Sequence, residues 1–429
     1  MNQLGNADLV QSMTRKDHVL VSIGGRVKRI MLDNLANAIN IAGSEMLRQT
    51  AWGVPVKQST QSNTDWGRIG NLTAWQEYKR RSGRFLVTAD GRAAKLNPSS
   101  STIYADGTPL DETKGNIMVI APRLYFRVEE DSVLGLTLWM SELPIGGYYI
   151  GNTGYNVMGS YLGTMDGSKL VSRRGSPPKG AMTIDAFWNA AQVNGSSWGL
   201  VDYDLRKLMI MIALSEYGNT NIQEMLGYGM GGSGGSTWDE AILKPTGETA
   251  HLGDHFGTAL SGLEIGTDTC HVSLMGIEDP YSWLWENVQG IYFGSSDNVT
   301  QTGAEVFLYS GNRMPSAAEL ADKPQGDYRV LERIPSASSS YIKEMIIGPQ
   351  FDIIPTVITG GGSTSYWADG YWSAPTGQLA RWGGAAATGS FSGLSALSAS
   401  LAWSNSYASY GSRLAYYGDL RFVNGREIN

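Results

Sequence analysis

Residues 381–413 read RWGGAAATGSFSGLSALSASLAWSNSYASYGSR, and this stretch is the most informative part of the 429-residue chain. Between the two terminal arginines it contains no Asp, Glu, Lys or His, and 21 of its 33 residues are Ala, Ser or Gly. A disordered segment would be charged and poor in aromatic residues, whereas this one carries Trp382, Phe391, Trp403, Tyr407 and Tyr410. Small residues adapt to a partner, and aromatic residues supply contact area at low entropic cost. The composition predicts a binding surface held in a fixed frame.

The frame resembles that of the variable proteins of diversity-generating retroelements. In those proteins adenine-directed reverse transcription rewrites a C-terminal segment of a C-type lectin fold, which formylglycine-generating enzymes share. The resemblance is carried by the run GGAAATGSFSGL at 383–394 and by the closing Gly411-Ser412-Arg413. A second stretch, Gly276–Asn287, is similar to the Trp-rich signature of formylglycine-generating enzymes, but it has Tyr281-Ser282 where the signature has Gly-Asn. With the order of residues in Leu205–Gly229, the matches cover roughly residues 200–420.

By position, the resemblance implies a set of variable side chains that bind the ligand. The implied positions, with the Trp that lies between them, are Ala387, Thr388, Phe391, Ser398, Ser400, Leu401, Trp403, Asn405, Tyr407 and Ser409. Trp403 fits either a ligand-binding or a scaffold role. The expected scaffold of the site is Arg381, Trp382, Gly383, Gly384, Gly411 and Arg413. There the glycines allow a tight backbone, and the arginines anchor loops by hydrogen bonds.

The expected fold class is α+β, with a C-terminal C-type lectin fold. We expect an N-terminal attachment or oligomerisation region at 1–50, a small connecting domain at 51–115, and a lectin-like ligand-binding domain at 116–429 that contains the variable segment 381–413. In the first region Val19–Ile23 predicts a strand. The apolar residues at spacings of three and four predict a helix, packed on its own domain or in a short oligomerising bundle: Leu32, Leu35, Ile39, Ala42 and Met46.

Alternating apolar residues and turn signals predict several strands, at Phe85–Thr88, Ile117–Ile120, Leu124–Phe126 and Leu136–Met140. Leu205–Leu214 is the most apolar helix candidate, with a plausible stop at Gly218-Asn219. A further helix is expected to end near Arg81.

Composition argues against several classes of function. The net charge of -7 and the lack of a basic stripe give nucleic-acid binding little support, and no apolar run approaches the 18 residues that a membrane span needs. Cys270 is the only cysteine, so no intramolecular disulfide is possible. The N-terminal residues lack the charged and apolar regions of a secretory signal. Synthesis in a reducing cytoplasm is expected.

The sequence offers little for catalysis, and we expect no catalytic site, cofactor or metal. The absence of any cysteine between 276 and 429 means that the oxidase activity of formylglycine-generating enzymes is not carried over. His251 and His255 have a metal-ligand spacing, but Gly253 between them favours a loop. Asp202, Asp204 and the acidic run at 129–131 have no spacing that predicts a calcium site.

The resemblance, together with the expected synthesis in the cytoplasm, implies a phage tail-fibre or tail-tip protein, located in the virion, that binds a bacterial cell-surface receptor of protein or glycan. Residues 1–50 would attach it to other tail proteins, and a homotrimer is the favoured assembly. An enzyme related to formylglycine-generating enzymes and a bacterial surface adhesin are the alternatives.

Overall fold

The computed structural model describes residues 18–23, 26–31, 47–57, 66–131, 134–232, 243–260, 268–294, 304–309, 312–316, 329–335, 339–374 and 379–429. At the N-terminus β1 (His18–Ile23) and β2 (Arg26–Met31) form an antiparallel hairpin that is a sheet of its own. The predicted strand at Val19–Ile23 is thus confirmed. The apolar stripe from Leu32 to Met46 lies outside the described residues.

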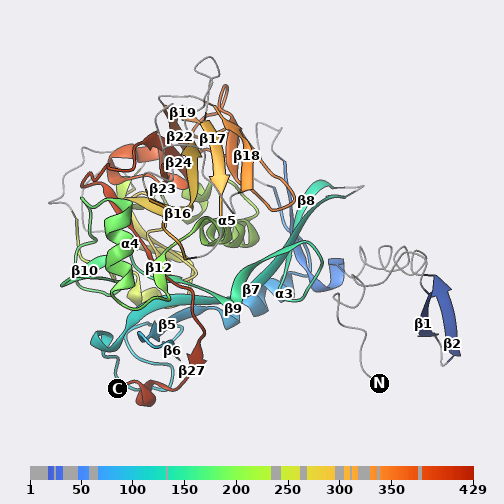
Figure 1. Cartoon of the computed structure of the whole chain (residues 1–429), viewed down its shortest axis with the longest axis horizontal. Coiled ribbons are helices and arrows are strands. Elements are labelled where there is room, and N and C mark those ends of the chain that lie inside the picture. The colour runs from blue at the N-terminus through green and yellow to red at the C-terminus, as the bar shows by residue number, and fades with distance from the viewer. Residues whose placement is uncertain are drawn as a thin grey trace.

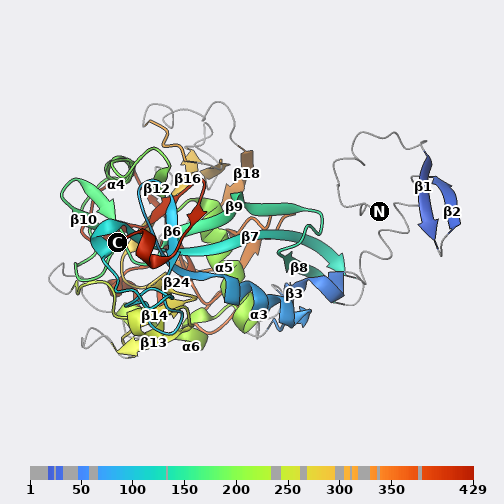
Figure 2. The ribbon, with the colours of Figure 1, turned by 90° about the horizontal axis from the view of Figure 1, so that it is seen from below.

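The first of two large sheets has ten strands. Its main path is β12 (Trp198–Leu200), β26 (Leu414–Tyr416), β9 (Tyr148–Gly159), β7 (Asn116–Asp131), β5 (Gly83–Val87), β6 (Arg92–Lys95) and β27 (Arg421–Phe422), with β3 (Trp52–Pro55), β4 (Ile69–Gly70) and β8 (Gly135–Ser141) attached. The long strands β7, β8 and β9 run side by side, as Figure 2 shows. Since β5 pairs directly with β7, segments on both sides of residue 115 contribute to this one sheet.

The second large sheet has eight strands. Its order is β18 (Arg329–Ile334), β17 (Ala304–Leu308), β16 (Trp285–Gly294), β23 (Leu379–Gly383), β24 (Gly393–Leu401), β22 (Gly370–Ser373) and β19 (Ser340–Tyr341), with β25 (Tyr410–Ser412) paired to β16. Three of these strands, β23, β24 and β25, contain parts of the segment 381–413. The smaller sheets are β10 (Thr164–Asp166) with β11 (Lys169–Val171), β13 (Gly257–Leu260) with β14 (Cys270–Leu274) and β15 (Ile277–Glu278), and β20 (Glu344–Ile346) with β21 (Ile354–Val357).

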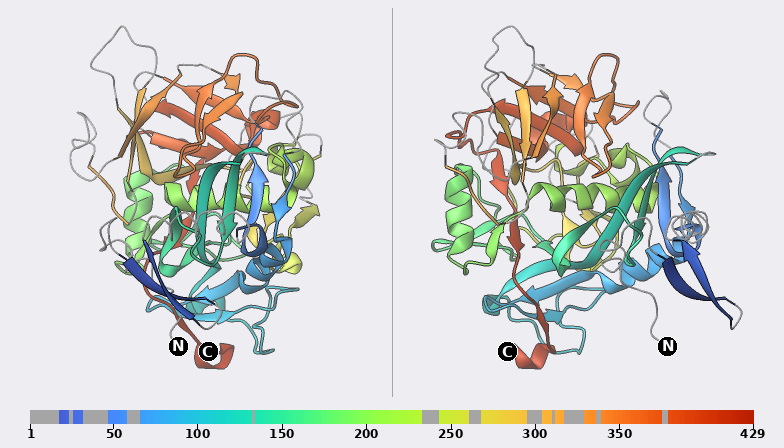
Figure 3. Two further views of the ribbon diagram at one scale, coloured as in Figure 1. Left: turned by 90° about the vertical axis from the view of Figure 1, so that its right-hand side faces the viewer. Right: turned by 45° about the vertical axis from the view of Figure 1, so that its right-hand side comes forward.

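The helix α5 (Tyr203–Tyr217) lies between the two large sheets (Figures 1 and 3). It contacts β9 and β3 of the ten-stranded sheet and β16 and β24 of the eight-stranded sheet. Almost every side chain of α5 is buried, including those of Arg206 and Lys207. The Asp202 side chain caps its N-terminus, and Gly218 ends it in the left-handed conformation, with φ 60°. The predicted helix and its stop are confirmed.

Further α-helices are α3 (Leu72–Arg81), α4 (Ile184–Gln192) and α6 (Ile222–Leu226), and residues 47–50 are also helical. Short 3₁₀ turns complete the helical structure: η1 (Glu112–Lys114), η2 (Gly229–Gly231), η4 (Ala250–Leu252), η5 (Ala386–Phe391) and η6 (Gly425–Glu427). The end of α3 at Arg81 agrees with the prediction. Among the described residues, none of these helices has the length and apolar character needed to cross a bilayer.

The predicted fold class, α+β with a C-terminal C-type lectin fold, is wrong. The described residues are predominantly β, in several mainly antiparallel sheets. The predicted strands are present in β5, β7 and β8. The error concerned how they combine, because β7 pairs with segments on both sides of it in the sequence and β26 and β27 return from the C-terminus to the same sheet. The strands therefore form shared sheets rather than separate regions.

Candidate binding face

One side of the eight-stranded sheet carries a row of residues from five neighbouring strands. Residues that pair across strands point to the same side of a sheet. The row consists of Trp372 on β22, Ser398 on β24, Arg381 on β23, Asn287 on β16 and Ser412 on β25. The adjacent row contains Tyr371, Leu397 and Trp382, which belong to the main hydrophobic core. The first row therefore lies on the side away from that core, which we call the outer face.

Aromatic side chains gather on the outer face. Trp285 and Trp372 meet edge to face, with ring centroids 5.2 Å apart, and both pack with Tyr410 around Ala396. Phe391 stacks on Tyr341 at 4.2 Å and lies 5.5 Å from Trp372. Except for Trp285, which is buried, these rings are partly exposed. Such rings combine a rigid apolar body with a low entropic cost of contact, so the outer face is suited to binding.

The predicted variable positions differ in exposure. Ala387 in η5 and Tyr407 in the loop 402–409 are exposed, Tyr407 by 55%. The half-buried positions are Thr388, Phe391, Ser400, Leu401, Asn405 and Ser409. Ser398 is buried, although it belongs to the outer row and its hydroxyl lies 3.1 Å from that of Ser400. Contacts or strand pairing link Phe391, Ser398, Ser400 and Tyr407 to the outer face, but only Ala387 and Tyr407 of the predicted positions are freely exposed.

Trp403 is not part of an exposed surface, contrary to its inclusion among the ligand-binding positions. Its side chain is 8% exposed and packs against Tyr292, with ring centroids 5.9 Å apart. Both belong to a buried cluster that also contains Leu379. The burial of its large apolar ring inside the loop stabilises the fold, so Trp403 anchors the loop that carries Tyr407.

Thr388 has a structural role in addition to its partial exposure. Its hydroxyl accepts a hydrogen bond from the Ala385 amide at 3.0 Å and donates one to the Ala385 carbonyl at 2.6 Å. These bonds hold the first turn of η5. A replacement without a hydroxyl would leave that turn without its side-chain cap.

All six predicted scaffold residues are buried. Gly383 and Gly384 have φ values of 95° and 81°, a conformation that disfavours other residues. A Cβ atom on Gly411 would lie 2.7 Å from Leu284 Cδ1. Only glycine fits these positions without a shift of the surroundings.

Arg413 has its whole guanidinium bonded. It forms an ion pair with Glu286 of β16, with Nη2 3.0 Å from Oε1 and Nε 3.2 Å from Oε2. The remaining donors reach the carbonyl oxygens of Gly159, Ser160, Glu278 and Asp279 at 2.8–3.1 Å.

Arg381 is held by Asn287, the residue after Glu286. Its Nε donates to Asn287 Oδ1 at 2.9 Å, and Asn287 Nδ2 donates to the Gly411 carbonyl at 2.9 Å. The ring of Tyr410 lies over the guanidinium, 4.2 Å from ring centroid to Cζ. Burial lowers the pKa of Arg381 to about 10, although Tyr410 and Tyr407 oppose the shift. Two adjacent residues of β16 therefore hold both arginines of the frame.

Sequence patterns did not place Tyr341, Trp372 or Asn287 in the site, and they singled out Tyr410 only as one of the aromatic residues of the segment 381–413. Gly370–Ser373 is a strand of only four residues. If it had been predicted as a strand, the alternation of side chains would have placed Trp372 and Tyr371 on opposite faces of the sheet. The roles of Asn287 and Tyr410 depend on pairing with distant strands, for which the local sequence has no signal.

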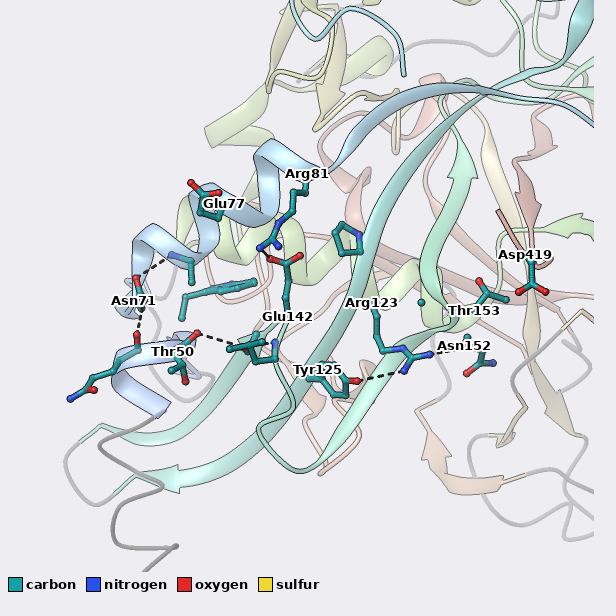
Figure 4. Close-up of a pocket in the computed structure, with 17 residues that line it drawn as sticks. Thr50, Asn71, Glu77, Arg81, Arg123, Tyr125, Glu142, Asn152, Thr153 and Asp419 are labelled. Carbon is teal, nitrogen blue, oxygen red and sulfur yellow. Dashed lines mark hydrogen bonds and ion pairs between the residues drawn. The ribbon is translucent and has the colours of Figure 1, made fainter. Parts of the chain in front are cut away.

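A separate groove of about 890 Å³ lies beside α3 and the strands β7 and β9 (Figure 4). Two of its cationic side chains are paired. Arg81 forms an ion pair with Glu142, and Arg123 donates to the carbonyls of Gly151 and Asn152 at 2.7 Å. None of its lining residues belongs to 381–413. The groove is therefore not part of the predicted site.

Reactive groups outside the binding face are few in the described part. Burial raises the pKa of the half-buried Cys270 thiol, which reduces its nucleophilicity at neutral pH. His251 and His255 are exposed, and no three His, Cys, Asp or Glu side chains of the described ranges gather as metal ligands. The Asp202 carboxylate accepts from the Leu205 amide at the start of α5.

Neither a protein-family model nor a curated protein matches this chain. The functional interpretation therefore comes from the geometry of the outer face and from the sequence of the segment 381–413.

Proposed function

We propose that the chain is a phage receptor-binding protein that presents the outer face and the loop 402–409 to a receptor on the bacterial surface. One observation carries the proposal. The segment 381–413 is anchored at both ends by buried arginines, whereas Ala387 and Tyr407 between them are exposed. This combination suits a surface whose side chains change while its backbone stays in place.

Substitutions at the exposed positions and in the buried frame differ in their cost in stability. Substitutions of exposed side chains usually change stability by less than about 0.5 kcal/mol. Breaking a buried ion pair such as Arg413–Glu286 costs about 3–5 kcal/mol. Selection on binding could therefore alter the exposed positions freely, while the frame tolerates little change.

The further proposal is that a diversity-generating retroelement rewrites this segment. Neighbouring DNA tests it, because such an element leaves a near-identical template repeat that differs mainly where the template has adenines. An adjacent reverse-transcriptase gene is expected as well. A genome in which residues 381–413 have no second copy would contradict this part of the proposal and leave receptor binding untouched.

We also propose that the protein works in several copies on a phage tail, with residues 1–50 attaching it to other tail proteins and a homotrimer as the unit. Linked copies raise apparent affinity by avidity, which compensates for weak single contacts. Light scattering tests the assembly, and a stable monomer at micromolar concentration would exclude the trimer.

The experiment for receptor binding uses the fluorescently labelled full chain on a panel of bacterial strains. The protein is expected to label a subset of strains, and the double variant Ala387→Glu, Tyr407→Glu, which puts two negative charges on exposed positions of the segment 381–413, is expected to lose that labelling. The control is Tyr148→Glu, because Tyr148 is also an exposed tyrosine (40%) but lies on β9 of the other large sheet. If both variants label the same cells as the parent protein, the outer face is not the receptor site.

A further inference from the structure

Four arginine side chains in the described part are fully buried: Arg84, Arg206, Arg381 and Arg413. In three of them both terminal nitrogens donate hydrogen bonds. Arg84 reaches Thr249 with both, Arg206 reaches the carbonyls of Pro280 and Leu394, and Arg413 is fully bonded. In Arg381 only Nε is bonded, and neither Nη1 nor Nη2 has a hydrogen-bond partner within the described ranges.

The guanidinium of Arg381 is thus an incompletely satisfied cation. Its two free nitrogens carry four N–H donors, and leaving a buried donor without a partner costs about 1–3 kcal/mol. Arg413, by contrast, is compensated by the Glu286 carboxylate. Burial lowers the pKa of Arg381 to about 10, so that it still carries its charge at neutral pH. The neighbours that influence this charge are the hydroxyls of Tyr410 and Tyr407, not a carboxylate.

This cation lies within the binding face. Arg381 pairs across the sheet with Ser398, which in turn pairs with Trp372. Above it Tyr410 stacks on the guanidinium, and the exposed Tyr407 meets Tyr410 edge to face, with ring centroids 5.1 Å apart. Tyr407 belongs to a loop, and side chains on loops reorient more easily than those in a core. The tyrosine pair is therefore a cover over a buried positive charge.

We infer that Arg381 is an anion subsite of the binding face, which takes the carboxylate of an acidic saccharide when the Tyr407–Tyr410 cover moves aside. The inference rests on the proposed function and names the class of receptor. A guanidinium donates two parallel hydrogen bonds to a carboxylate, a geometry that lysine cannot reproduce.

The surroundings favour a saccharide carboxylate over other anions. Arg381 supplies one positive charge, which one carboxylate balances, whereas a phosphate monoester carries about 1.5–2 negative charges at pH 7. The partly exposed rings of Trp372 and Phe391 offer flat apolar surfaces to sugar rings, and the half-buried Ser400 offers its hydroxyl to sugar hydroxyls.

The test compares matched charged and neutral sugars by titration calorimetry at pH 7. The pairs are trigalacturonate with its methyl ester and sialyllactose with lactose. At least one acidic sugar is expected to bind at millimolar concentration or below, and its neutral partner at least tenfold more weakly. Arg381→Lys should weaken binding of the acid at least tenfold, because lysine cannot donate the two parallel hydrogen bonds. Tyr407→Ala should strengthen it severalfold by removing the outer half of the cover.

Other results would overturn the inference. One such result is that each charged sugar and its neutral partner bind equally well. Another is that neither acidic sugar binds to the parent protein or to the Tyr407→Ala variant. A third is that inorganic phosphate or an acidic peptide binds more tightly than the acidic sugars. If Arg381→Lys fails to fold, the sugar pairs and Tyr407→Ala decide the question. The two proposals can fail separately. Cell labelling that excess acidic sugar does not inhibit refutes the subsite alone, whereas the absence of labelling on every strain refutes receptor binding.

Discussion

Arg413 and Glu286 form a fully buried ion pair at the point where the chain passes from one large sheet to the other. Arg413 lies between β25, which pairs with β16 in the eight-stranded sheet, and β26, which pairs with β9 and β12 in the ten-stranded sheet. Its other donors bind four backbone carbonyls from two further segments of the chain. One side chain thereby ties the variable segment to both sheets.

We predict that Glu286→Gln lowers the free energy of unfolding by about 3–5 kcal/mol, because it leaves a buried arginine without its counter-charge. Urea denaturation at pH 7 measures the change. The control is Glu77→Gln, which removes an exposed ion pair with Arg80 and should have no measurable effect. Similar midpoints for both variants would mean that the buried pair does not hold the frame.

Local pattern was enough to predict individual elements. The mainly apolar run at 205–214 predicted α5, and Gly218 predicted its end, because glycine readily adopts the left-handed conformation that ends a helix. Alternation of apolar and polar residues with a period of two predicted the strands in β5, β7 and β8, because successive side chains of a strand point to opposite faces. These elements depend on residues that are close together in the sequence, so they can be predicted from one sequence alone.

Long-range pairing was not predictable in this way. Arg381 and Asn287 are 94 residues apart, and Arg413 and Glu286 are 127 apart. Their bonds exist only because β16 lies between β23 and β25. The same limit explains Trp403, since a tryptophan in a loop of Ser and Ala can turn toward solvent or toward the core. Trp403 turns toward the core because its ring packs against Tyr292, which lies beside the loop.

The loop 402–409 yields a second prediction. Trp403→Ala should destabilise the protein by about 3 kcal/mol or more through the lost burial of its ring. Tyr407→Ala should change stability by less than about 0.5 kcal/mol, because Tyr407 is 55% exposed. Urea denaturation of both variants measures the contrast. Equal losses would show that Tyr407, like Trp403, supports the fold, and the proposed variable surface would then be smaller.

A third prediction concerns Asp202, the N-cap of α5. Burial, with the neighbouring Asp204, raises the pKa of Asp202 from 3.8 to about 7. The folded protein therefore holds this proton more tightly than the unfolded chain, and the contribution of Asp202 to stability falls as the pH rises from 3.8 to 7. Asp202→Asn keeps a side-chain oxygen that can accept from the Leu205 amide, as the Asp202 carboxylate does at 2.8 Å, but cannot become charged.

The variant Asp202→Asn should therefore gain stability relative to the parent protein by roughly 3 kcal/mol between about pH 4 and about pH 8. Thermal melts at both pH values measure the difference. A stability difference between the two proteins that is the same at both pH values would mean that the carboxyl titrates normally in the folded state.

A fourth prediction concerns the buried pair His271 and Asp279, whose Nδ1 and Oδ2 atoms are 2.7 Å apart. Burial alone would lower the pKa of His271, but Asp279 outweighs burial, with smaller contributions from Glu278 and Glu248, and raises that pKa from 6.5 to about 9. Because the folded pKa is the higher one, the pair stabilises the protein fully below pH 6.5 and loses this contribution as the pH rises through 9.

Asp279→Asn removes the charge and keeps an acceptor for the Val272 amide, which Asp279 Oδ1 binds at 3.0 Å. Asparagine also tolerates the φ of 45° at this position. The variant should be less stable than the parent protein by about 3 kcal/mol at about pH 6, and the gap should narrow toward zero at about pH 9.5. Urea denaturation at the two pH values measures the gap. A gap of the same size at both would show that Asp279 acts through its hydrogen bonds alone, with His271 neutral throughout.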